Sequence, residues 1–205
     1  MGGGKGGGNE AKQARKDEQE RQQRIREGTT KINSTFDSQF NDKFFDGRRD
    51  AFMSYATPQL EDQYGKAGKE LTFSLARGGL LDSSARGQKM GELQKLYDVN
   101  KQKVADDALA SSTQAKNAVE DARGNLISTL NATGDAQGAA NSALTRASVL
   151  SQPAAYSPLG QLFTDFTSTL GIQAAQERAA AASGGSYKSN YDTGLFGNAG
   201  RVTVR

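Results

Sequence analysis

Hydrophobic positions between residues 32 and 53 recur at helical spacing, and most of them are aromatic. The series consists of Ile32, Phe36, Phe40, Phe44, Phe45, Phe52 and Met53. The four-residue spacing of its first members makes a continuous stripe along one side of an α-helix. Thr57-Pro58 is expected to end this helix, because the residue before a proline disfavours the α conformation. The stripe either faces a core formed with a neighbouring helix or is an amphipathic face for a membrane or hydrophobic partner.

Two segments of different composition precede the stripe. Residues 1–9, MGGGKGGGN, are glycine-rich and predict a flexible leader. Residues 10–27 are strong helix formers of both charges and carry almost no apolar side chain before Ile25. They predict a solvated helix with paired charges, or partial disorder, and Gly28 with the following threonines allows a break. The first structured segment is therefore expected to span residues 10–57.

A helical hairpin is predicted after Pro58. Apolar residues are spaced helically from Leu60 to Leu75, and the pair Gly78-Gly79 follows as a C-terminal stop that tolerates positive φ. Asp82 and Ser83 are good N-caps for a second helix. We therefore expect two helices folded back on each other around Gly78 and Gly79.

The second helix of the hairpin is expected to be long and alanine-rich. No proline occurs between Gln88 and Leu150, and two apolar series repeat every eleven residues. An eleven-residue repeat keeps a packing seam nearly straight. The candidate oligomer seam consists of Leu93, Tyr97, Val104, Ala108, Ala115, Val119, Leu126 and Leu130. Glycines weaken the later part, so a break near NATGDAQG is possible within the segment 58–150.

The C-terminal part divides into two segments. Residues 151–183 begin with a loop punctuated by Pro153 and Pro158 and continue as an amphipathic helix. Its candidate membrane- or partner-facing residues are Leu162, Phe163, Phe166 and Leu170, and those of the first stripe are Ile32, Phe36, Phe40, Phe44, Phe45 and Phe52. Residues 184–205 form a Gly/Ser-rich tail, whose last residues, RVTVR, alternate as a short strand would.

Composition favours helices that share their apolar faces with other chains. Only 35% of the 205 residues are hydrophobic, and many of these are alanine, so a conventional core would be thin. The sequence contains no run of about 18 apolar residues, so it predicts no ordinary transmembrane helix. The 26 basic and 23 acidic residues leave a net charge of +3 without a dense cationic cluster, which disfavours tight nucleic-acid binding. Homo-oligomerisation is the first inference.

Nothing in the sequence indicates an enzyme. Histidine and cysteine are absent, which excludes thiolate nucleophiles and histidine-based metal sites or triads. The adjacent acidic pairs Asp106-Asp107 and Glu120-Asp121 point in different directions on a helix and are interpreted as solvated surface charge. No catalytic residue, metal site or cofactor is therefore predicted.

Three stretches carry a resemblance to a known family. They are the leader MGGGKGGGN, the block QLEDQYGKAGKELTFSLARGGLLDSSARGQK and the later AANSALTRASVLSQPAAYSPLGQLF. Together they resemble ejection proteins of short-tailed bacteriophages, also called internal virion or DNA transfer proteins. The resemblance implies storage in the virion interior, release through the tail at infection and assembly in the host envelope as a conduit for the genome. The smaller members look like builders of an outer-membrane pore.

The resemblance and the patterns lead to one expected architecture. We expect a mainly α-helical fold of elongated helices, with a hairpin and a long Ala-rich helix, that assembles as a homo-oligomeric ring or tube with flexible Gly-rich termini. Implied partners are other phage ejection or tail proteins, the host outer membrane or periplasm, and transient non-specific contact with passing DNA. The alternative is a structural neck, tail or internal core protein that stays in the virion.

Overall fold

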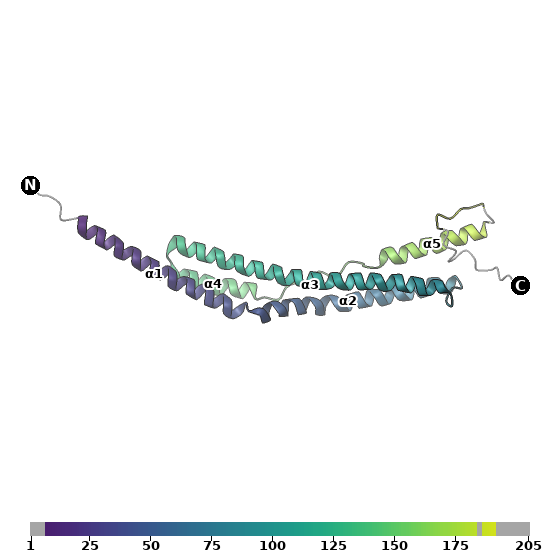
Figure 1. The fold of residues 1–205 in the computed structure, drawn as a ribbon, viewed down its shortest axis with the longest axis horizontal. Helices are drawn as coiled ribbons and strands as arrows, with labels where there is room; N and C mark the ends of the chain where they lie inside the picture. Colours follow the sequence, from purple (N-terminus) through teal and green to yellow (C-terminus); the bar gives the residue numbers. More distant parts are fainter. Residues whose placement is uncertain (1–6, 184–185, 192–205) are drawn as a thin grey trace, which may run out of the picture. The chain divides into compact units, whose positions relative to one another are not determined.

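The chain is mainly α-helical, as the sequence predicts. The computed structural model describes residues 7–183 and 186–191, and within them it contains helices and no β-strand (Figure 1). The helices are α1 (Gly7–Gln39), α2 (Asp42–Arg77), α3 (Ser84–Thr133), α4 (Ala136–Leu150) and α5 (Thr164–Ala182). With its 50 residues, α3 is about 75 Å long at about 1.5 Å per residue.

The chain forms two compact units, and each is assembled from two separate stretches of sequence. Unit 1 comprises residues 1–51 and 108–155, and unit 2 comprises residues 52–107 and 156–205. Helices α2 and α3 therefore contribute residues to both units. The consecutive segments expected from the sequence do not coincide with these units, because composition changes along the chain do not report which distant segments pair.

The predicted helical hairpin is confirmed. Helix α2 ends at Arg77, and Gly79 adopts a φ of 69°. The amide of Gly79 donates to the Ala76 carbonyl at 3.0 Å, and that of Leu80 donates to the Leu75 carbonyl at 3.0 Å. This is the Schellman arrangement, in which a left-handed glycine lets the last helical carbonyls find donors. Further from the turn, the Tyr64 hydroxyl donates to Gln94 of α3 at 2.7 Å, so the two helices run antiparallel.

The possible break in the long helix is also confirmed. Helix α3 stops at Thr133, Gly134 has a φ of 68°, and α4 starts at Ala136. The Asp135 side chain caps the new helix by accepting a hydrogen bond from the Gly138 amide at 2.9 Å. A side chain at Gly138 would collide with this carboxylate, since an added Cβ would lie 2.2 Å from Asp135 Oδ2.

The expected helix end at Thr57-Pro58 is wrong, because α2 continues through Pro58. The proline ring is exposed, while Ala56 and Leu60 on either side are buried in unit 2. Gln59 also donates from Nε2 to the Tyr55 carbonyl at 3.0 Å. Burial of the flanking side chains therefore outweighs the local cost of a proline inside a helix.

The chain breaks before the aromatic stripe ends, at Phe40 and Asn41, and not at Gly28. Helix α1 continues through Gly28, which is buried, and the Thr29 hydroxyl donates back to the Ile25 carbonyl at 2.9 Å. At the actual break, Asn41 Oδ1 accepts from the Phe44 amide at 3.2 Å and caps α2. The stripe therefore spans two helices.

Each unit has its own hydrophobic core. In unit 1, α1 with the residue after it, α3 and α4 contribute Ile32, Phe36, Phe40, Val119, Ala122, Leu126, Leu130, Ala139, Ala143 and Ala147. In unit 2, α2, α3 and α5 with the residue before it contribute Ala56, Leu60, Ala67, Leu71, Leu75, Leu93, Val104, Phe163, Leu170 and Ala174. The buried apolar residues are thus divided between two small cores and do not form one large hydrophobic core.

The chain ends are described only in part. Residues Gly7–Asn9 of the expected leader already belong to α1, and the rest of the leader lies outside the described residues. In the tail, residues 186–191 follow α5, and the Asn190 amide donates to Gln176 Oε1 at 3.2 Å. The expected terminal strand RVTVR also lies outside the described residues.

Candidate functional surfaces

The first aromatic stripe lies in the core of unit 1. Ile32 and Phe36 are fully buried and Phe40 is 6% exposed. The phenylalanine rings of the stripe contact one another in series. Their centroids lie 5.5 Å apart for Phe36 and Phe40 and 5.0 Å apart for Phe40 and Phe44. The core-facing interpretation of these residues is the one that the structure supports. In the described chain they face other helices of unit 1 and not solvent.

An arginine of α3 closes one side of this aromatic core. Arg123 Nη2 lies 2.6 Å from Asp37 Oδ1 of α1, and its guanidinium carbon lies 5.6 Å from the centroid of the Phe36 ring. The ion pair is partly exposed on the Asp37 side, so it contributes modestly, but it fixes the register between α1 and α3. No sequence pattern singled out Arg123, because its partner is 86 positions away.

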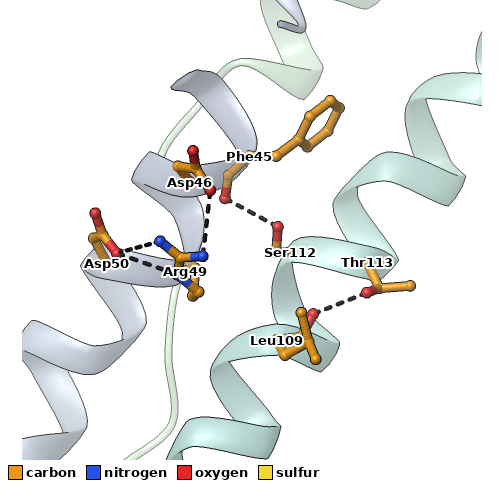
Figure 2. Close-up of polar contacts among 7 residues, drawn as sticks. All are labelled: Phe45, Asp46, Arg49, Asp50, Leu109, Ser112 and Thr113. Atoms are coloured by element: carbon orange, nitrogen blue, oxygen red, sulfur yellow. Dashed lines mark hydrogen bonds and ion pairs between the residues drawn. The ribbon is translucent and has the colours of Figure 1, made fainter. Parts of the chain in front are cut away.

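The last two aromatic residues of the stripe in unit 1, Phe44 and Phe45, are partly buried and form what is here called the aromatic rim. Phe44 and Phe45 pack against the core from α2, and the Arg48 guanidinium lies 5.1 Å from the Phe44 ring centroid. Figure 2 shows Ser112 of α3 donating from Oγ to the Phe45 carbonyl at 2.9 Å. The same view shows Arg49 paired with Asp46 and Asp50 along α2. Charges therefore border the aromatic rim on α2.

The second aromatic face is packed in unit 2. Phe163 and Leu170 are buried, Leu162 and Phe166 are partly buried against the same core, and Phe52 joins it from α2. The segment before α5 is held through its backbone, because the Leu162 amide donates to Gln63 Oε1 at 2.8 Å. This face is also directed towards the chain's own helices.

The predicted oligomer seam is a packing line within the chain. Leu93, Val104, Ala108, Val119, Leu126 and Leu130 are buried, and Tyr97 and Ala115 are half-buried. The eleven-residue repeat correctly marked one side of α3, but that side is covered by the chain's other helices. Sequence periodicity identifies a face that needs a partner and does not tell whether the partner belongs to the same chain.

An apolar groove near the hairpin turn was missed by the sequence analysis. It measures about 420 Å³ and lies in unit 2, lined mainly by α2 residues and by Met90 of α3. Gly65 leaves open space above α2, and the neighbouring Phe73 is 68% exposed. The glycines of the block QLEDQYGKAGK were the signal that could have indicated a bare helix face.

Shifted pKa values among the described residues belong to charge pairs three positions apart on the same helix. A hydrogen bond from Arg21 lowers the pKa of Glu18, and Glu18 in turn raises the pKa of Arg21. Lys89 likewise lowers the pKa of Glu92 through a 2.8 Å hydrogen bond. Within residues 7–183 and 186–191, no group of three acidic side chains is placed to hold a metal ion.

Comparisons with known proteins add no family assignment. No family model, no curated protein and no solved structure matches this chain. Among the described helices, none has a stretch that is both long enough and apolar enough to cross a membrane.

Proposed function

We propose that this protein is an ejection protein of a short-tailed bacteriophage. It is stored in the virion interior, leaves the particle at infection and oligomerises in the host envelope, where it contributes to an outer-membrane conduit for viral DNA. The resemblance of the three sequence stretches motivates this proposal. The proposal involves no catalytic step, metal or cofactor.

One structural observation carries the proposal. An aromatic face, Ile32 to Phe40, is sheltered inside a single chain that has no apolar span among its described helices. A protein that is stored before it meets a membrane needs such shelter, because a large exposed apolar patch would cause aggregation. A helical assembly in the envelope also satisfies its backbone hydrogen bonds internally.

The oligomer would be built from surfaces other than the seam of α3. The seam residues pack within the chain, whereas Val99 and Leu109 on the same helix are 66% and 59% exposed. Polar side chains of α3 would face the passing DNA without binding its phosphates tightly. Other ejection or tail proteins and the outer membrane are the partners of this assembly.

A fixed virion component is the second candidate, and the covered seam favours it. A neck, tail or internal core protein does not have to form a tube, so its long helices can complete their packing within one chain. In that case the aromatic faces stay buried in protein throughout infection.

Quantitative mass spectrometry of intact and DNA-emptied particles distinguishes the two candidates. The amount of this protein is measured relative to the major capsid protein, which serves as the internal control. We expect the protein to be present before release and lost afterwards. Equal amounts in both particles would replace the ejection proposal by the fixed component, and absence from both would reject the virion assignment.

A further inference from the structure

We propose that α4 is a displaceable cover over the aromatic face of unit 1, hinged at Gly134 and latched by Arg48. When it opens, the cover uncovers Ile32, Phe36 and Phe40 while the rest of unit 1 stays folded. Three features of unit 1 support this device: buried side chains of α4 that are alanines, local hydrogen bonds at the joint before α4 and a charged side chain that fastens its far end.

The cover is attached through alanines. Ala139, Ala143 and Ala147 are spaced by four residues and are the buried side chains of α4. Two larger side chains of the helix point elsewhere, since Leu144 is 55% and Val149 is 60% exposed, and Leu150 at its end is only partly buried against the core. Each alanine buries a single methyl group, so α4 itself exposes little apolar area when it leaves. The aromatic residues beneath it are much larger.

The joint before α4 is satisfied by local hydrogen bonds. On the α3 side, the Gly134 amide donates to the Leu130 carbonyl at 2.7 Å. On the α4 side, Asp135 caps the helix through the Gly138 amide. Neither bond crosses from α4 to another helix. Helix α4 can therefore rotate about Gly134, whose φ of 68° shows a glycine conformation, and remain capped.

The far end of α4 is fastened by one side chain of α2. Arg48 Nη2 donates to the Leu150 carbonyl at 2.7 Å and also to the Gln152 carbonyl. The same guanidinium packs on the ring of Phe44, which in turn contacts Phe40. A charged donor on two carbonyls is among the stronger hydrogen-bonding arrangements. Arg48 therefore links the cover to the aromatic face that it shields.

Cysteine reactivity in the full-length protein measures the opening, because the natural chain contains no cysteine. Ala143→Cys places a thiol under the cover, at a fully buried position of α4. Ala108→Cys places one at a fully buried position of α3 in unit 1, where it reports opening of the unit as a whole. The rate of modification by a small thiol reagent is measured for each variant under native conditions.

We expect the thiol at position 143 to react about tenfold faster than the thiol at position 108, because a local opening requires less free energy than unfolding of the unit. Adding Arg48→Ala should accelerate the thiol at position 143 by about another tenfold through loss of the charged hydrogen bonds, without affecting position 108. Arg49→Ala is the matched control. This substitution removes the same charge one residue away. The Arg49 side chain pairs with Asp46 and Asp50 of α2 (Figure 2).

Equal rates at both positions in every background would overturn the cover, because unit 1 would then open only as a whole. The same acceleration by Arg49→Ala and Arg48→Ala would overturn the latch. Amide hydrogen exchange of the unsubstituted protein provides a second measurement that does not depend on any variant. Amides of residues 139–150 should exchange faster than those of residues 110–130, and equal protection would contradict the proposal. These rates test the isolated protein, whereas particle composition tests ejection, so either proposal can fail without the other.

Discussion

Gly28 of α1 lies directly against Leu130 of α3. A Cβ placed on Gly28 would lie 2.7 Å from Leu130 Cδ2 and 3.1 Å from the Ala136 Cβ. Leu130 is fully buried, so it has little room to turn away. The glycine that looked like a helix breaker in the sequence is therefore a point of close approach between α1, α3 and the start of α4.

This relationship predicts that Gly28→Ala destabilises unit 1. Alanine would improve helix propensity by about 1 kcal/mol, but overpacking a filled core costs about 1–3 kcal/mol. We expect a net loss of about 1 kcal/mol in the free energy of unfolding, measured by urea denaturation followed by circular dichroism. Gly124→Ala in α3 is the control, because open space surrounds Gly124 and only the propensity gain remains. A gain at position 28 equal to that of the control would contradict the close approach.

The hairpin turn predicts a second sensitive glycine. Gly79 has a φ of 69°, which costs a residue with a Cβ about 1–2 kcal/mol. Gly79→Ala should therefore lower the free energy of unfolding by about that amount. Gly87→Ala, at an open position early in α3, should leave it unchanged or raise it by up to about 1 kcal/mol. The two variants are compared by thermal and urea denaturation, and equal effects would show that the turn does not need its glycine.

The sequence predicts local features of this fold well and long-range packing poorly. The Gly78-Gly79 turn and the break after Thr133 follow from glycine and capping residues that lie within a few positions of each other. Pro58 was misjudged because the burial of its neighbours depends on α3 and α5, which are distant in sequence. The contacts of Arg48 with the end of α4 depend on residues about 100 positions away and leave no local pattern.

The same limit applies to the candidate surfaces. The spacing of Ile32, Phe36 and Phe40 identified a face that must be covered, and the structure places other helices of unit 1 on it. The seam of α3 was likewise recognised as a packing face but assigned to another chain. In both cases the hydrophobic pattern indicated burial, and only the tertiary arrangement identified the partner.

The pair of Lys89 and Glu92 predicts a small pH dependence of stability. The Lys89 hydrogen bond lowers the pKa of Glu92 below its ordinary value of 4.5. A carboxyl with a lowered folded pKa contributes stability above the unfolded pKa and loses it as the pH falls through the folded pKa. Because the Glu92 side chain is 40% exposed, we expect less than about 1 kcal/mol.

Glu92→Gln should therefore be slightly less stable than the natural chain at pH 7, and the difference should disappear as the pH is lowered from about 4.5 into the acid range. Urea midpoints at a series of pH values measure this difference. Lys89→Met and the double variant complete a cycle that isolates the pair. A difference that persists unchanged at the lowest pH would show that Glu92 acts through packing and not through its charge.

The course of α2 through Pro58 gives the last prediction. Proline lacks the amide that would donate to the Ser54 carbonyl, and its ring is exposed, so its replacement loses little packing. Pro58→Ala should raise the free energy of unfolding by about 1–3 kcal/mol, reduced by the greater freedom that alanine gives the unfolded chain. Glu61→Ala, also at an exposed position of α2, should change it by less than about 0.5 kcal/mol. Destabilisation by Pro58→Ala would show that the proline ends a helix there, as its sequence context suggests, and would contradict a continuous α2.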